Sequence, residues 1–247
     1  MRAPVLAAAL ILVAVALLFA TLVPAGAHVA LDPERAEEAL RVVATHHAVA
    51  REGQGEASLD ALFKLGEAAD GLVELLNQDL AAHGETTLLA RMLVKRLQAY
   101  SVRVTLSETA TRYAYDHAAF EKYLKRAPRG PRAPDARFKL IARDFYATLG
   151  PDPAVLVNAD MSALLRAIAT EERFLRDHAG PEKTDQVRFF LAVDYYRASR
   201  NTADAARAAR YAERARRELA VVVARSPETF EGRAAEALLE RLNGAGR

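Results

Sequence analysis

The sequence predicts an all-α protein, organised as an α-solenoid of helix-turn-helix repeats. Three observations support this fold class. Ala, Leu, Arg and Glu, which favour helices, dominate the composition. Apolar residues keep helical spacing, as in the stripe formed by Leu72, Leu75, Leu76 and Leu80. Short segments also recur along the chain, which is typical of repeat architectures.

The first 27 residues have the pattern of a secretory signal peptide. Arg2 precedes an uncharged apolar run over 5–23, and Ala25 and Ala27 form a small-residue cleavage site. Cleavage after Ala27 would make His28 the first mature residue. The alternative is a retained membrane anchor, because the run approaches the roughly 20 residues that span a bilayer. Both interpretations place the remaining chain outside the cytoplasm, either periplasmic or anchored and facing the periplasm.

The composition excludes several classes of site. The chain has 247 residues, a formal net charge of +2 and 0 Cys. Without cysteine there is no disulfide scaffold, thiolate metal site, cysteine nucleophile or lipid attachment through cysteine. The small charge imbalance and the expected export both argue against a nucleic-acid partner.

Residues 28–105 are expected to form an N-terminal helical region. Pro33 after Asp32 opens the first helix, since proline is favoured at the first helical position. Ser58 is the expected N-cap of the second helix, Gly84 ends it, and Thr87 starts the third. The expected helices cover 33–52, 58–83 and 87–100.

Residues 106–247 are expected to form the repeat region, with six helices. The loop over 126–134 contains three prolines, which block a helix there, and Asp135 is the expected cap of the helix that follows. The expected helices cover 107–127, 135–150, 160–180, 182–200, 202–225 and 228–243. The best strand candidate in the whole chain, 102–106, is short and unconvincing.

Three sets of similar segments support stacked helix pairs. Residues 60–65 recur at 135–140 with five of six identities, and 138–146 recur at 188–196. The last helix repeats the small-residue pattern at 234–239. The spacing is irregular, so a generic bundle of Ala-rich helices remains the alternative to a solenoid.

The segment 119–128, followed by 133–140, resembles a junction between tetratricopeptide repeats. In that family one helix ends in a large apolar residue and proline, and the next begins with a small residue. Residues 217–227 followed by 234–239 resemble the junction again. The similarity is greatest to envelope members of the family, of the Tol-Pal-associated and outer-membrane assembly types. It implies a protein-binding scaffold or assembly factor.

Two features depart from the tetratricopeptide family. The spacing is longer than the usual repeat of roughly 34 residues. The lack of cysteine also excludes a lipoprotein of the assembly type, which leaves a soluble or helix-anchored relative.

Histidine and carboxylate patterns do not indicate a catalytic centre. His46 and His47 are neighbours on an expected helix, so their side chains point about 100° apart and cannot easily share a metal. A mature N-terminal His28 could chelate copper, although known copper braces use a β-sandwich. The adjacent pairs Glu37-Glu38 and Glu171-Glu172 are expected to lie on solvated helix faces. We assign no catalytic, cofactor or metal residue.

Basic and aromatic side chains are the candidates for partner binding. Arginines gather around the Pro-rich loop and on the helix over 202–225, where Glu213 is expected to pair with Arg217. Such a surface could contact a protein partner, an anionic lipid or a cell-wall polymer, or it could be an ordinary solvated face. Tyrosines of the recurring segments are expected to line a groove for the partner. The assigned residues are Tyr146, Tyr195, Tyr196, Arg126, Arg129, Arg132, Arg210 and Arg214.

These observations lead to the hypothesis of a non-enzymatic scaffold or assembly factor in the cell envelope that binds a protein partner. One alternative is an anchored accessory subunit of a membrane complex, associated with the membrane through its uncleaved N-terminal segment. A second alternative is an all-α enzyme that binds a metal or small molecule.

The N-terminal prediction can be tested by intact-mass measurement of the protein purified from the cell envelope. We expect a mass that begins at His28, because the small-residue site favours cleavage after Ala27. A mass that retains residues 1–27 would contradict cleavage and favour the anchored subunit.

Overall fold

The computed structural model describes residues 31–107, 112–147, 160–178 and 180–244, which are mostly helical. The expected signal peptide or anchor, residues 1–27, lies outside the described residues. Contacts divide the chain into unit 1, which ends at Asp116, and unit 2, which begins at His117. The boundary expected after residue 105 falls within a strand, Val104–Ser107, that belongs to unit 1.

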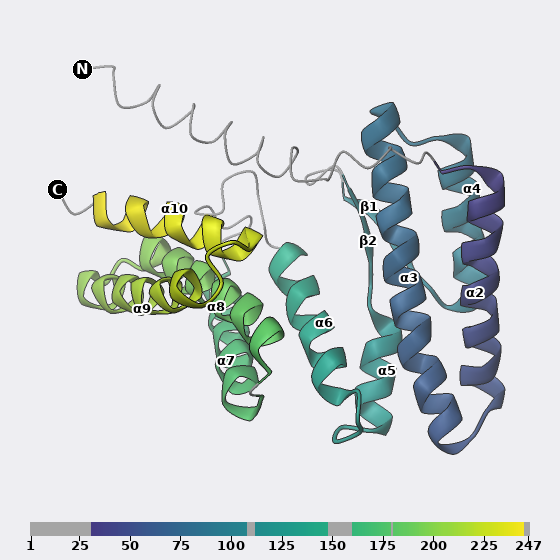
Figure 1. Cartoon of the computed structure of the whole chain (residues 1–247), viewed down its shortest axis with the longest axis horizontal. Helices are drawn as coiled ribbons and strands as arrows, with labels where there is room; N and C mark the ends of the chain where they lie inside the picture. The colour runs from purple at the N-terminus through teal and green to yellow at the C-terminus, as the bar shows by residue number, and fades with distance from the viewer. Residues whose placement is uncertain (1–30, 108–111, 148–159, 179, 245–247) are drawn as a thin grey trace. The chain divides into compact units, whose positions relative to one another are not determined.

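Unit 1 is built from three α-helices and a short hairpin in the residues described. The helices are α2 (Pro33–Glu52), α3 (Gly55–His83) and α4 (Leu88–Leu97), and a 3-10 turn follows at Gln98–Tyr100. Helix α2 packs against both α3 and α4, and α2 and α3 run side by side (Figure 1).

Local capping explains three of the helix ends in unit 1. The Asp32 carboxylate accepts a hydrogen bond from the Arg35 backbone N–H at 2.8 Å, and Pro33 follows as expected. The Thr87 hydroxyl likewise caps α4. Helix α3 ends at Gly84, whose φ of 71° is left-handed and favours glycine.

One expected cap is wrong. Helix α3 begins at Gly55 rather than at Ser58, and the Ser58 hydroxyl donates to the Ala50 carbonyl at 2.8 Å. The buried hydroxyl therefore joins α3 to the last turn of α2.

The expectation of a helix over 107–127 is wrong in its first part. Strands β1 (Val104–Ser107) and β2 (Arg112–Tyr115) form an antiparallel hairpin in which Val104 faces Tyr115. Val102, Val104, Tyr113 and Tyr115 are all buried, so alternate β-branched and aromatic residues cover one side of the hairpin. This period of two outweighs the helix propensity of the segment.

The side chain of Asn77 on α3 hydrogen-bonds to the backbone of β2, as a neighbouring strand would. Its amide oxygen accepts from the Tyr113 N–H at 2.7 Å, and its amide nitrogen donates to the Tyr113 carbonyl at 3.1 Å. Both backbone groups of a buried residue are thereby satisfied. A two-stranded hairpin is marginal alone, and α3 supplies the support it needs.

Unit 2 contains six α-helices within the described residues. They are α5 (Ala118–Arg126), α6 (Ala133–Ala147), α7 (Met161–Asp177), α8 (Pro181–Asn201), α9 (Ala205–Arg225) and α10 (Phe230–Gly244). The Pro-rich loop separates α5 from α6 as expected. Asp160 caps α7, whereas α6 begins two residues before its expected cap, Asp135.

The helices of unit 2 pack in sequence and also at alternate positions. Each helix from α5 to α10 contacts the next, and α8 also contacts α6 and α10 (Figure 1). The recurring segments 138–146, 188–196 and 234–239 lie on α6, α8 and α10. The similar segments therefore lie on helices that contact one another, α6 with α8 and α8 with α10.

Helix α8 forms the centre of the unit 2 core. Every residue of 189–198 is buried, although these ten positions include every face of the helix. The Phe145 ring of α6 stacks on Phe190 of α8 with centroids 4.1 Å apart. Leu219 and Val222 of α9 are fully buried in the same core.

In the described ranges, no helix is both long and apolar enough to span a lipid bilayer.

A glycine in α10 offers a test of this packing. A Cβ on Gly232 would lie 1.9 Å from the Ser226 carbonyl oxygen, so Gly232→Ala should lower the free energy of unfolding by about 2 kcal/mol or more. Gly71→Ala in α3 is the matched control, because its Cβ would meet nothing within 4 Å. It should stabilise the protein by about 0.5–1 kcal/mol. Equal effects in urea unfolding would contradict the close contact.

Candidate functional site

The three tyrosines expected in a groove lie in different environments. Tyr146 on α6 is 37% exposed, and its ring packs edge-on against Phe145 and Phe190. Tyr195 and Tyr196 on α8 are buried, with 2% and 6% exposure. Of these three tyrosines, only Tyr146 presents its ring at the surface of unit 2. A partner could reach Tyr195 and Tyr196 only if a covering helix moved.

The expected arginines are all exposed, and they form two groups along the chain. Arg126, Arg129 and Arg132 lie at the end of α5 and in the loop before α6, whereas Arg210 and Arg214 lie on α9. The expected pair between Glu213 and Arg217 is wrong, because Glu213 lies 3.6 Å from Arg216 instead.

The backbone of the loop that presents Arg129 and Arg132 is held in place by side-chain contacts. The hydroxyl of the buried Tyr123 accepts a hydrogen bond from the Arg132 backbone N–H at 3.0 Å. A Cβ on Gly130 would lie 2.6 Å from that hydroxyl, so glycine allows the close approach. Arg137 donates to the Pro128 carbonyl. The arginines therefore extend from a fixed backbone.

A polar network links α7, α8 and α9 near the surface. The Tyr195 hydroxyl donates to the Glu172 carboxylate and accepts from Arg214 at 2.7 Å, and Arg214 also lies 3.3 Å from Glu172. Burial, followed by the hydrogen bond to Glu172, raises the pKa of Tyr195 to about 12. Tyr195 thus remains a neutral hydrogen-bond donor. The Arg214 guanidinium is partly used for contacts within unit 2.

Glu171 and Glu172 are both expected on a solvated helix face. Glu172 is half-exposed, but Glu171 is buried, so the expectation is wrong for Glu171. Glu171 is only 1% exposed. It follows Leu164 and Ile168 at helical spacing and therefore falls on the apolar stripe of α7. That spacing is the signal in the sequence that indicates its burial.

Glu171 belongs to a buried ionic cluster with Asp194 and Arg197, which are 2% and 0% exposed. Arg197 Nη1 donates to Asp194 Oδ1 at 2.9 Å, and the guanidinium carbon lies 5.3 Å from the centre of the Phe145 ring. The ionic cluster, defined by Glu171, Asp194 and Arg197, thus lies among α6, α7 and α8.

The environment of the ionic cluster favours neutral carboxyls. Burial, followed by the neighbouring charge of Asp194, raises the pKa of Glu171 well above its usual value. Burial also raises the pKa of Asp194 to about 6, although the Arg197 charge and hydrogen bond oppose the rise. The raised pKa values favour protonation of these carboxyls, and all three side chains of the cluster are buried away from the surface.

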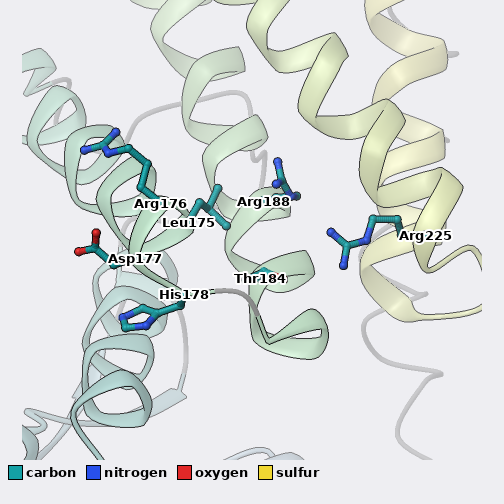
Figure 2. A pocket seen from close by; sticks show the side chains of 7 residues that line it. All are labelled: Leu175, Arg176, Asp177, His178, Thr184, Arg188 and Arg225. Atoms are coloured by element: carbon teal, nitrogen blue, oxygen red, sulfur yellow. The ribbon is translucent and has the colours of Figure 1, made fainter. Parts of the chain in front are cut away.

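A separate cavity of about 250 Å³ opens where the end of α7, the start of α8 and the end of α9 meet. Arg188 of α8 and Arg225 of α9 direct their guanidinium groups between the two helices, whereas Arg176 and Asp177 point away (Figure 2). Arg188 lies 2.7 Å from Glu218, and Arg225 lies 3.2 Å from Asp185. These carboxylates neutralise the two arginines, so the cavity has no excess charge that selects a ligand.

The histidines that the structure describes do not gather with other ligands into a metal-binding group. Across the described residues, no group of three or more histidine and carboxylate side chains could hold a metal ion. His47 packs edge-on against Tyr100 at 5.7 Å, and His178 packs against Phe174 at 4.5 Å. Burial, followed by the charge of Arg137, lowers the pKa of His178. His28 lies outside the described residues.

Removing the cation should show how far unit 2 depends on the ionic cluster. Arg197→Met leaves the two buried carboxyls without their counter-charge and should lower the free energy of unfolding by about 3–5 kcal/mol at neutral pH. Arg200→Met, at an exposed position one turn later on α8, is the control and should change it by about 0.5 kcal/mol or less. Urea unfolding of both variants measures the difference. Similar losses in the two variants would show that Arg197 has no special role.

Comparison with protein-family models, curated proteins and solved structures finds no match for this chain. A functional assignment therefore rests on the chemistry of its own residues.

Proposed function

We propose that the chain is exported and acts in the cell envelope as a non-enzymatic scaffold or assembly factor, with unit 2 as a solenoid-like repeat module that binds a protein partner. The observation that supports this most directly is the recurrence of 138–146 at 188–196. The two segments lie on α6 and α8, which contact each other, and α10 contacts α8 in turn. Stacked helix pairs in binding scaffolds have this arrangement.

A line of arginines on α9 is the surface proposed to meet the partner. Arg207, Arg210, Arg214 and Arg217 are exposed, and their spacing of three and four residues places them along one face of the helix. Leu219 and Val222 anchor a different face in the core. We call these four residues the arginine stripe.

The arginine stripe is only partly neutralised within unit 2. Arg207 lies 3.3 Å from Asp204, and Arg214 contacts Glu172 and Tyr195. In the described ranges, neither Arg210 nor Arg217 has an ion pair or a side-chain hydrogen bond. These two guanidinium groups are available to a partner without breaking an internal contact.

The chemistry favours an acidic protein segment as the ligand. A guanidinium group binds a carboxylate through two parallel hydrogen bonds, which gives both attraction and a defined geometry. A helical or extended segment with Asp or Glu at matching intervals could pair with successive arginines. The fixed loop with Arg129 and the exposed ring of Tyr146 offer further contacts. A phosphate group of an anionic lipid or cell-wall polymer can accept the same two hydrogen bonds, so the experiment below has to distinguish these ligands from a protein segment.

Site-specific crosslinking in cells tests this proposal. The full chain would carry a photoreactive phenylalanine derivative in place of Arg210, and in place of Glu236, an exposed residue of α10, as the control position. We expect a discrete protein adduct from position 210 that position 236 does not give. Adding Arg217→Glu should reduce the adduct about tenfold or more, because charge reversal turns attraction into repulsion.

Arg200→Glu is the matched charge control, since Arg200 is exposed but lies outside the arginine stripe. It should leave the adduct unchanged. Adducts that are the same at both positions, or that survive Arg217→Glu, would contradict docking on α9. Crosslinks to lipid or polymer without a protein adduct would contradict a protein partner.

A further inference from the structure

The ionic cluster has an imbalance of charge that folding must resolve. Glu171, Asp194 and Arg197 contribute two carboxyls and one guanidinium, and all three are almost completely buried. If both carboxyls were ionised, the cluster would hold one uncompensated negative charge away from water. Such a charge is costly in a protein interior, and a buried acid avoids the cost by keeping its proton.

The hydrogen bonds identify which carboxyl is less stable as an anion. Asp194 accepts a hydrogen bond from Arg197 at 2.9 Å, which stabilises its charged form. Glu171 Oε2 is buried and has no hydrogen-bond partner in the part of the chain that the structure describes. The proton therefore belongs on Glu171.

The charged groups around Glu171 come from few elements. Helix α7 packs against α6 and α8. On α8, the charged groups near Glu171 are Asp194 and Arg197. On α7 itself, the charged group near Glu171 is Glu172, which contacts Arg214 of α9. Helix α6 contributes the Phe145 ring to the cluster.

On α6, the charged residues nearest in sequence to Phe145 are Arg143 and Asp144, which pair with each other at 2.8 Å. The Arg143 guanidinium also contacts Glu121 of α5. Among the residues that the structure describes, only Arg197 therefore offsets the two carboxyls of the cluster.

We infer that Glu171 holds a proton in the folded protein at neutral pH, and that the packing of α7 against α8 is coupled to this proton. Raising the pH removes the proton, leaves two negative charges beside one guanidinium, and loosens α7. The raised pKa of Glu171 supports the same direction. The ligand of this buried site is a proton. Binding of the proton keeps α7 packed against α8, and this packing therefore depends on pH.

The sign of the pH dependence follows from linkage. A carboxyl whose pKa is higher in the folded state binds more protons there than in the unfolded state, so stability falls as pH rises above the unfolded value. For Asp194 this loss continues to about one pH unit above its folded pKa of about 6. Any loss above about pH 7.5 then comes from Glu171, because neither Asp194 nor an unfolded histidine, with a pKa of about 6.5, changes its protonation appreciably there.

Hydrogen exchange of the α7 amides in the full chain measures this coupling. After correction for the intrinsic exchange rate at each pH, the opening equilibrium constant of α7 should rise up to about tenfold per pH unit from about pH 7.5 to pH 9. Glu171→Gln, which keeps a neutral side chain of similar shape, should abolish this rise. Glu172→Gln, the same change at the neighbouring half-exposed residue, should preserve it.

A direct titration does not depend on how the variants fold. Carbon-13 NMR of the Glu171 carboxyl in the wild-type chain should show the neutral form at pH 7. An ionised Glu171 at pH 7 would overturn the inference, and so would a pH-dependent opening of α7 that persists in Glu171→Gln.

Discussion

Burial of α8 on every side is the constraint on which the structure of unit 2 depends. Residues 189–198 have no face in contact with water, so any polar group among them must find its partner inside the protein. Asp194 and Arg197 meet this requirement by pairing one turn apart on the same helix. Glu171 joins them from α7, and the one guanidinium of the cluster, Arg197, is already paired with Asp194. The packing of a central helix thereby creates a site whose state depends on a proton.

The recurring segments show how similar sequences behave on two contacting helices of unit 2, α6 and α8. Asp144 of α6 corresponds to Asp194 of α8, yet the Asp144 side chain is 61% exposed and pairs with Arg143 at the surface. Where α6 has Arg143, α8 has the buried Val193. Tyr146 and Tyr196 differ in the same way. Helix α8 is covered by neighbours on both sides, and this difference in environment changes an ordinary surface acid into a buried one.

Local signals in the sequence predicted more of the structure than long-range ones. Capping by Asp32 and Thr87 and the break at the Pro-rich loop depend on neighbouring residues, and they are confirmed. The hairpin was missed because its stability comes from Asn77, more than thirty residues away. The burial of Tyr195 was missed for a similar reason. Helical spacing shows which residues share a face, but it does not show how many faces of a helix are covered.

The division between a buried α8 and an exposed arginine stripe on α9 underlies both the proposed docking and the proton coupling. Its most direct test is hydroxyl-radical footprinting of the full chain, comparing Tyr146 with its counterpart Tyr196. We expect rapid oxidation of Tyr146, which is 37% exposed, and strong protection of Tyr196, which is 6% exposed. Equal reactivity of the two rings would show that α8 is not enclosed by its neighbours, and it would contradict the burial of the ionic cluster on this helix.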